Sequence, residues 1–302
     1  YSRNGDVYFS VDKHKNYGKL SGREIENQIE NAAGRLKIKQ KESKQNSLDF
    51  ALWKKSQSDE ISYSSPWGNG RPGWHIECSA MVKEELGESI DIHLGGSDLI
   101  FPHHENEIAQ SEACNGKQLA KYWLHNGMVN VGGEKMSKSL GNFTTIRSLL
   151  EGGISPMTLR FFVLQTNYRK PLDFTEESLK AASKGWERLN NSLSFGHIYK
   201  SKNQEINEIK LDQPIKRSIN EVLDEDSLKL LSDFERYMDD DLNTSGALSK
   251  LFELSEPIRK CINLLKDKDI SAIHKDDLNR VFNKWQLLSE LSSVLGLKVN
   301  LN

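Results

Sequence analysis

The chain has 302 residues, of which 36% are hydrophobic and 28% are charged, as is usual for a globular protein with a real core. Its net charge of −2 gives no sign of nucleic-acid binding, although a basic patch on a neutral protein can still bind RNA. No apolar run reaches about 18 residues, which excludes a membrane-spanning helix. The polar opening from Tyr1 to Ser10 is not a signal peptide. Because the first residue is Tyr and not Met, we expect that the chain was cut from a longer one.

The three cysteines, Cys78, Cys114 and Cys261, are widely separated. An odd number at such spacing argues against a disulfide framework and favours a reducing cytoplasm. We interpret Cys114 and Cys261 as small buried residues of helices. Cys78 then needs an explanation of its own.

The first 60 residues combine a strand-like piece over residues 6–11 with a charged segment, in which residues 40–46 are typical of a solvated loop. Two prolines and three glycines between Ser64 and Gly73 mark a boundary. Five of the eight histidines then lie between His75 and Gly141. This density of potential ligands makes the stretch the first place to look for a site.

A strand, a glycine turn and a helix are predicted inside this histidine-rich stretch. Residues 89–94 alternate as a strand and run into the glycine turn 95–98. Pro102 suits the first turn of a helix, and residues 103–114 have helix-forming composition. This order is the α/β arrangement that places ligands at the carboxyl ends of strands.

After Asp173 the pattern is helical almost to the end of the chain, apart from a polar interruption over residues 198–215. Thr175 followed by two glutamates indicates a helix N-terminus. Apolar residues recur at spacings of three and four in three runs: Leu179, Ala182, Trp186, Leu189 and Leu193; Leu228, Leu231, Phe234, Tyr237 and Met238; Val281, Trp285, Leu288, Leu291 and Leu295. We predict a helical bundle, with Trp186 and Trp285 in its core.

Cys78, His103 and Glu107 form the first candidate site. His103 and Glu107 are four residues apart, so on a helix they share one face. A thiolate, an imidazole and a carboxylate together suit Zn²⁺, and three ligands with an open fourth position describe a catalytic site. For Cys78 alone, a buried cysteine beside ordinary polar helix residues is the better explanation, because its distance in sequence from the helix is too long for a metal motif.

Two further strings suit nucleotide chemistry. Gly95 and Gly96 let a nucleotide approach the backbone, and Asp98 can accept a hydrogen bond from a ribose hydroxyl, although a Gly-Gly pair is most often only a turn. Lys135 and Lys138, within Glu134–Asn142, can neutralise charge that builds on a triphosphate. Such lysines usually lie on a solvated face, but this string is highly specific.

These strings resemble the cysteinyl-tRNA synthetases, a family of class I aminoacyl-tRNA synthetases. Lys135-Met136-Ser137-Lys138-Ser139 matches the KMSKS loop of that class. Residues 70–81 resemble the stretch that carries a zinc cysteine in the family, and residues 96–107 resemble the segment with its histidine and glutamate ligands. The resemblance extends from about Val7 to about Leu297 and so covers nearly the whole chain.

The resemblance implies an α/β plus all-α fold, in which the second half of a class I Rossmann-like nucleotide-binding catalytic domain precedes a helical bundle. Residues 1–62 would be the remainder of a connective region, and residues 63–145 the half-domain with the zinc site and the KMSKS loop. Residues 146–176 would form a stem-contact linker. Residues 177–302 would form the tRNA-binding bundle, whose turn over residues 239–244 contacts tRNA.

The implied activity is that of a cysteine–tRNA ligase. L-Cysteine is activated by ATP to cysteinyl-adenylate and transferred to tRNA(Cys), while zinc selects the substrate thiolate. The implied cofactor is one Zn²⁺ per chain, and ATP is a substrate with Mg²⁺. We expect L-cysteine, ATP and tRNA(Cys) as partners of a cytoplasmic monomer that binds no membrane.

The resemblance also assigns roles to single residues of the amino-acid site. The zinc ligands would be Cys78, His103 and Glu107. Trp74 would wall the cysteine pocket, which His75 and His93 would line. His104 would have a supporting or structural role.

At the nucleotide site, Asp98 with Gly95 and Gly96 would face the adenosine ribose. Lys138 would contact the ATP phosphates as the loop closes, supported by Lys135. These two lysines are the expected catalytic residues.

The sequence departs from the family in lacking a His-Ile-Gly-His motif and a further zinc cysteine. Half of the ATP site and one zinc ligand are thus absent, as is the small anticodon-reading module that usually follows, so we expect the 302 residues alone to be inactive. Two alternatives stay open: a ligase that passes cysteine to an amino sugar, as in mycothiol synthesis, and a non-catalytic zinc- and RNA-binding fragment.

Overall fold

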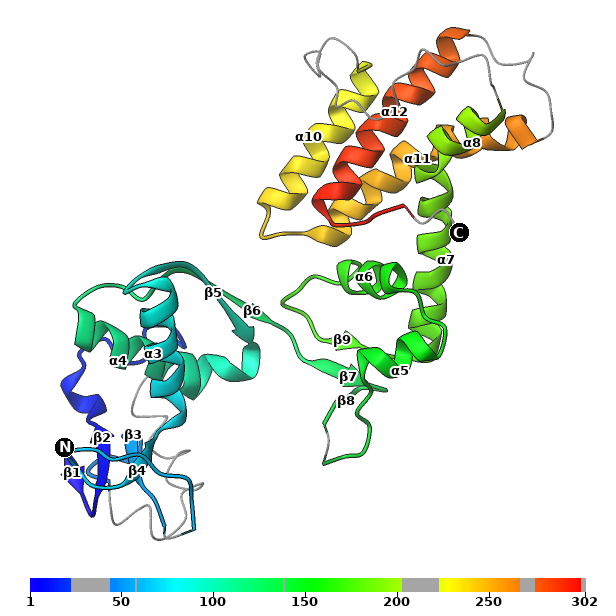
Figure 1. The fold of residues 1–302 in the computed structure, drawn as a ribbon. Helices are drawn as coiled ribbons and strands as arrows, with labels where there is room; N and C mark the ends of the chain where they lie inside the picture. Colours follow the sequence, from blue (N-terminus) through cyan, green and yellow to red (C-terminus); the bar gives the residue numbers. More distant parts are fainter. Residues whose placement is uncertain (23–43, 58, 138, 203–222, 267–274, 300–302) are drawn as a thin grey trace. The chain divides into compact units, whose positions relative to one another are not determined.

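The computed structural model describes residues 1–22, 44–57, 59–137, 139–202, 223–266 and 275–299. The chain divides into two compact units, Tyr1–Asn126 and Gly127–Asn302 (Figure 1). Each unit is considered by itself. None of the helices in the described ranges is long and apolar enough to cross a membrane.

The first unit opens with a four-stranded antiparallel sheet in chain order. Its strands are β1 (Ser2–Arg3), β2 (Asp6–Phe9), β3 (Phe50–Lys55) and β4 (Gly70–Pro72). The predicted strand over residues 6–11 ends at Phe9, because a short 3₁₀ turn follows at Val11–Lys13. Of the predicted loop 40–46, residues 40–43 lie outside the described residues.

The rest of the first unit is a β-α-β arrangement preceded by a helix. Its elements are α3 (Trp74–Leu86), β5 (Ile90–Gly96), α4 (Glu105–Asn115) and β6 (Ala120–Asn126). Strands β5 and β6 pair in parallel, from Ile90 opposite Ala120 to Gly96 opposite Asn126. The carboxyl ends of both strands therefore meet at one edge, and the segment that leads into α4 starts from that edge.

One local prediction in this region was wrong and another was confirmed. Gly95 and Gly96 belong to the end of β5 and not to a turn, and Gly96 has extended angles, φ −73° and ψ 153°. Pro102 opens the helical backbone that continues into α4 at Glu105, in agreement with its predicted place in the first turn of a helix. It lies in the preceding turn, Ile100–His104, where Phe101 adopts φ −137° and ψ 131° and so interrupts the helical backbone.

The second unit begins with a small three-stranded sheet and two helices. Strand β7 (Val129–Val131) pairs antiparallel with β8 (Glu134–Lys135) and parallel with β9 (Leu172–Asp173). The helices between β8 and β9 are α5 (Ile146–Glu151) and α6 (Pro156–Leu164). Ser155 caps α6 by accepting from the Thr158 amide, and Pro156 occupies the first turn.

A helical bundle follows, as predicted. Its helices are α7 (Glu176–Leu193), α8 (Phe195–Lys202), α10 (Glu225–Asp239), α11 (Thr244–Lys266) and α12 (Lys275–Val294). Thr175 caps α7 in a capping box with Ser178, which confirms the predicted helix start. The turn between α10 and α11 lies at residues 240–243, inside the segment singled out in the sequence. Because α8 runs to Lys202, the predicted polar interruption is wrong for residues 198–202, and residues 203–215 lie outside the described ranges.

The bundle core contains both predicted tryptophans. Trp186 and Trp285 are 4% and 7% exposed, and the Trp285 indole N–H donates to the carbonyl of Leu193 at 2.8 Å. Cys261 is buried, as predicted, and all three cysteines are free thiols. Cys114 is exposed, so its predicted burial was wrong: the buried face of α4 ends at Ser111, one turn earlier.

Candidate metal centre

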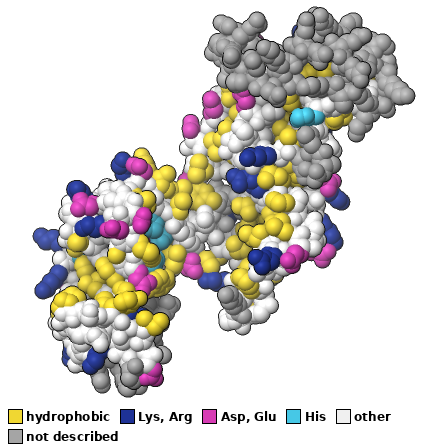
Figure 2. Space-filling view, in the orientation of Figure 1, with side chains coloured by type: hydrophobic (Ala, Val, Ile, Leu, Met, Phe, Trp, Pro, Cys, Tyr) yellow, Lys and Arg dark blue, Asp and Glu magenta, His cyan; other side chains and the backbone are white. Residues whose placement is uncertain are grey.

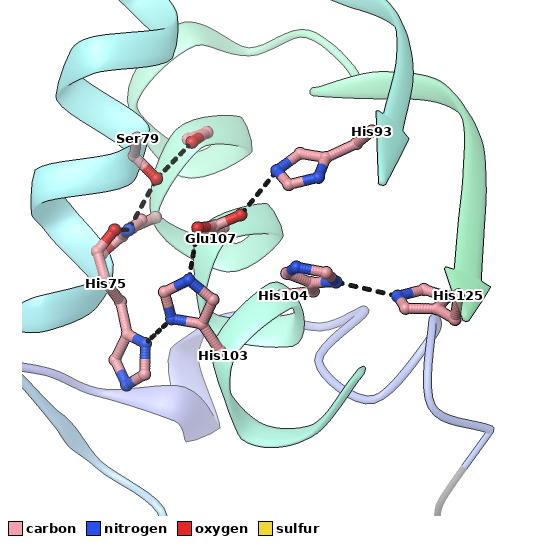
Figure 3. Close-up of polar contacts among 9 residues, drawn as sticks. His75, Ser79, His93, His103, His104, Glu107 and His125 are labelled. Carbon is pink, nitrogen blue, oxygen red and sulfur yellow. Dashed lines mark hydrogen bonds and ion pairs between the residues drawn. The ribbon is translucent and has the colours of Figure 1, made fainter. Parts of the chain in front are cut away.

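The Glu107 carboxylate lies at the middle of a histidine cluster in the first unit (Figure 3). Its Oε1 is 2.9 Å from Nε2 of His103, and its Oε2 is 2.8 Å from Nε2 of His93. The Glu107 side chain is only 2% exposed. The predicted contact between residues four apart is thus confirmed, and β5 supplies a second imidazole from the other side.

Cys78 comes to the same carboxylate from helix α3. The Sγ of Cys78, a ring nitrogen of His103 and a carboxylate oxygen of Glu107 all lie within 4.8 Å of one another. The sequence gap between Cys78 and His103 is closed because helices α3 and α4 pack together. The structure therefore joins the three predicted zinc ligands into one cluster.

The imidazole ring of His75 is hydrogen-bonded to that of His103. Nδ1 of His75 lies 2.8 Å from Nδ1 of His103. The main chain at His75 is in turn bonded to Gln110, whose Nε2 donates to the His75 carbonyl at 2.5 Å and to the Ser79 hydroxyl at 2.6 Å. The two helices are thus connected by polar side chains at the level of the cluster.

Tryptophan rings cover the imidazoles on either side of Glu107. Trp74 stacks on His103 with 4.3 Å between ring centroids, and Trp123 of β6 stacks on His93 at 4.4 Å. Trp74 remains 58% exposed, so its ring forms part of the surface beside the cluster. Histidine side chains also reach the surface of the first unit (Figure 2).

His104 belongs to a neighbouring part of the cluster. Its Nδ1 lies 2.8 Å from Nε2 of His125, at the end of β6. His93, His104 and Glu107 also offer ligand atoms within 4.8 Å of one another. The His104 ring packs against Gly95 so closely that a Cβ there would collide with it. A close approach to a side chain, and not a turn, is therefore what requires glycine at position 95.

Burial sets the charges of these groups. It lowers the pKa of His75 to about 4 and that of His104 to about 4, so both rings are neutral near pH 7. Burial also lowers the pKa of His103. For Glu107, burial by itself raises the pKa, but contact with His93 and the other imidazoles brings it below its ordinary value. The cluster is therefore a buried carboxylate among imidazoles, of which those of His75 and His104 are neutral near pH 7.

The donor set fits a zinc ion. Neutral imidazole nitrogen, carboxylate oxygen and thiolate sulfur are the ligands that zinc takes in proteins. Glu107 Oε2 is buried without a hydrogen bond of good geometry, which leaves the carboxylate with acceptor capacity for a cation. Burial and the Glu107 charge raise the pKa of the Cys78 thiol to about 11, so the thiol keeps its proton until a cation replaces it.

The other predicted site residues lie in different places. Asp98 lies two residues after Gly96, and a Cβ on Gly96 would come within 2.5 Å of its Oδ1, so the residues of this string are in close contact. Lys135 ends β8 in the second unit, and Lys138 lies outside the described residues. The sequence analysis did not identify His125, Trp123 or Gln110. The parallel pairing of β5 with β6 was the signal that could have pointed to the first two.

Comparison with known proteins shows the family of the chain. Residues 1–184 match the family model of the tRNA synthetases class I (C) catalytic domain. The chain belongs to this family. Residues 233–300 match the model of the DALR domain, a range that contains the end of α10 and helices α11 and α12 of the bundle. The predicted α/β plus all-α fold is therefore confirmed.

Curated relatives match over the whole chain. It is 85% identical over 302 residues to the cysteine–tRNA ligase of Prochlorococcus marinus strain NATL2A, and 57% identical over 303 residues to that of Synechococcus sp. strain WH7803. These matches cover 100% and 99% of this chain, but 60% of each relative. The chain thus spans about 60% of the length of these relatives.

Solved structures share the fold at low sequence identity. A Mycobacterium tuberculosis methionyl-tRNA synthetase bound by methionyl-adenylate is 14% identical with a TM-score of 0.55, and the match covers 95% of this chain and 58% of that one. A putative arginyl-tRNA synthetase from Campylobacter jejuni is 14% identical with a TM-score of 0.51, over 99% of this chain and 58% of that one. These likenesses concern the fold alone.

Proposed function

We propose that this protein ligates cysteine to tRNA(Cys). The cluster of Cys78, His103 and Glu107 carries the proposal, because a soft metal bound there suits a thiolate substrate. Curated relatives up to 85% identical that are named cysteine–tRNA ligases support it. The two alternatives, transfer to an amino sugar and a non-catalytic fragment, have no such support.

One zinc ion per chain would be held by Cys78 Sγ, His103 Nε2 and a carboxylate oxygen of Glu107. Bound zinc supplies a Lewis acid that takes up a substrate thiolate and so distinguishes cysteine from serine. The Cys78 thiol gives up its proton, and His103 offers a lone pair at Nε2. Trp74, stacked on His103 and open to the surface, forms one wall of the pocket, with His75 and His93 beside it. His104, held by His125, supports the cluster from the side of β6.

The nucleotide would lie at the carboxyl end of β5. Gly95 and Gly96 have no side chains, which lets a nucleotide approach the backbone there, and Asp98 accepts a hydrogen bond from the adenosine ribose. Lys135 and Lys138, the proposed catalytic lysines, neutralise the phosphates of ATP, which enters with Mg²⁺.

The reaction then has two steps. The carboxylate of cysteine attacks the α-phosphorus of ATP, which forms cysteinyl-adenylate and releases pyrophosphate. A terminal ribose hydroxyl of tRNA(Cys) next takes the cysteinyl group and releases AMP. Positioning and charge neutralisation supply the rate enhancement. The bundle with its turn at residues 240–243 binds the tRNA, and the protein acts as a cytoplasmic monomer.

The turn at residues 240–243 is held in one conformation by its contacts. Asp241 and Leu242 both have positive φ, 51° and 56°. Asp241 accepts hydrogen bonds from the Tyr168 hydroxyl at 2.8 Å and from Arg169 Nη2 at 3.0 Å. These contacts hold the turn in a conformation that side chains rarely adopt, which supports a binding role.

The test is cysteine-dependent exchange of pyrophosphate into ATP, followed by transfer to an acceptor. We expect exchange with cysteine and not with serine, and transfer to tRNA(Cys) but not to an amino sugar. A polypeptide with the full length of the relatives is expected to be active, and the 302 residues alone inactive. Transfer to the amino sugar, or exchange that is equal with serine, would contradict the proposal.

A further inference from the structure

The rings of His75 and His103 are joined by a hydrogen bond between two nitrogens of the same kind. Their Nδ1 atoms are 2.8 Å apart. A hydrogen bond between two imidazole nitrogens needs one N–H donor and one lone pair. The position of the proton on one neutral ring therefore determines its position on the other.

Without a metal, the carboxylate decides the tautomer. Nε2 of His103 lies 2.9 Å from Oε1 of Glu107, and an ionised carboxylate only accepts. His103 must then carry its proton on Nε2, which leaves a lone pair on Nδ1. His75 then donates a hydrogen bond from its Nδ1 to this lone pair.

A metal bound between Cys78, His103 and Glu107 would reverse the direction of the hydrogen bond between His75 and His103. Nδ1 of His103 is occupied by His75, so Nε2, which faces the carboxylate, is the nitrogen that ligates. A ligating nitrogen needs its lone pair, and the ring proton must move to Nδ1. We propose that metal loading reverses the His75–His103 hydrogen bond, so that His75 becomes the acceptor that fixes the ligating tautomer of His103.

This inference rests on the proposed zinc site and assigns His75 a positioning role. The protons balance: one leaves Nε2 of His103 for solvent, and the proton on Nδ1 of His75 passes to Nδ1 of His103. Nε2 of His75 then takes one proton from solvent, and both rings stay neutral. The contact of His75 with the proposed ligands is the hydrogen bond to His103.

The surroundings of His75 suit this role. Gln110 holds its carbonyl, Trp74 stacks on its ring with 5.3 Å between centroids, and Phe50 meets the ring edge-on at 5.6 Å and 90°. These contacts fix the ring while leaving its tautomer free to change. An acceptor that is already oriented stabilises the ligating form of a metal-bound histidine.

The direct test is the nitrogen-15 NMR signal of both rings in the full chain, recorded without metal and with one equivalent of Zn²⁺. We expect the proton of His75 on Nδ1 without zinc and on Nε2 with zinc, while His103 shows the opposite exchange. If zinc binds but His75 keeps the same tautomer in both states, the inference is wrong. If the wild-type chain binds no zinc, the proposed metal site itself is wrong.

A set of variants gives an independent measurement. His75→Asn keeps an atom near the Nδ1 position that can accept or donate, whereas His75→Phe keeps the ring shape and offers neither. We expect His75→Phe to weaken zinc binding about 10- to 100-fold, as loss of a partner of a metal-bound histidine does, and His75→Asn to stay within about threefold of wild type.

The matched control is His14→Phe in the same unit, whose ring packs on Phe9 and lies outside the cluster. It is expected to bind zinc as the wild type does. Wild-type zinc affinity in His75→Phe, or equal losses in the Asn and Phe variants, would overturn the inference. The amide spectrum of each variant shows whether it is folded, and the wild-type tautomer measurement decides the question if one is not.

Discussion

Helix α4 in the first unit buries polar side chains, whereas helix α7 in the second unit buries leucine and aromatic side chains. Seven consecutive residues of α4, from Glu105 to Ser111, are buried, and five of them are polar. The buried face of α7 is an apolar stripe that includes Trp186 and Leu189. The two helices therefore become stable by different means.

The polar face of α4 is stable because its groups are paired. Glu105 accepts hydrogen bonds from the backbone amides of Gly18 at 3.0 Å and Ser21 at 2.8 Å, and Asn106 accepts from the Tyr17 hydroxyl at 2.6 Å. Burying such polar groups destabilises the fold, and their hydrogen bonds only offset this cost. Burying each leucine of α7, in contrast, stabilises the fold. A helix with a buried polar face, such as α4, is typical of a functional site, whereas a helix with a buried apolar stripe, such as α7, is typical of a scaffold.

The largest expected effect is on the stability of the bundle. Leu189→Ala removes a side chain that is 0% exposed and should lower the free energy of unfolding of the second unit by about 2–5 kcal/mol. Denaturant unfolding measures this, with the exposed Lys184→Ala on the same helix as a control within about 0.5 kcal/mol. Zinc affinity should not change, because Leu189 and the metal centre belong to different compact units. A joint loss of stability and zinc affinity would contradict this division of roles.

The three cysteines allow a sharp test of the metal centre. Cys78→Ala should weaken zinc binding by about 100-fold or more, since it removes a ligand and not merely a ligand's partner. Cys114→Ala, on the exposed end of α4, should bind zinc as the wild type does. Chelator competition measures both affinities. Equal affinities in the two variants would show that Cys78 is not a ligand.

Zinc binding should also depend on pH. The Cys78 thiol, with its pKa raised to about 11 by burial and by Glu107, is protonated throughout the range from about pH 6 to 8, and zinc must displace that proton. The thiolate fraction rises about tenfold per pH unit below the pKa, so affinity should rise by about the same factor. His75, with a pKa of about 4, loses no proton in this window. An affinity that stays level between these pH values, measured by chelator competition, would contradict thiolate ligation.

The smallest expected effect concerns the start of α7. Thr175→Ala removes the side chain that accepts from the Ser178 amide and should lower the stability of the second unit by about 1 kcal/mol. Thr175→Ser keeps the acceptor and serves as the control. Thermal unfolding distinguishes them, and an alanine variant as stable as the serine variant would mean that the cap contributes nothing.

Local patterns predicted the bundle well. The stripe on α7 and the cap at Thr175 depend on residues within a few turns of one another, so spacing alone reveals them. Cys114 was mispredicted because burial on α4 depends on where helix α3 and the segment around Gly18 pack, which spacing along α4 does not show. The glycine pair at the end of β5 was taken for a turn because the contact with the His104 ring is not local.

The sequence by itself determined the family through its specific strings, and with it the identity of Cys78, His103 and Glu107 as candidate ligands. Only the tertiary structure decided which rings face the Glu107 carboxylate, that Trp74 and Trp123 cover them, and that His75 is hydrogen-bonded to His103. The physical reason is that these contacts join residues of α3, β5, α4 and β6 that are distant in the chain. They arise when a parallel strand pair and two packed helices bring those elements together.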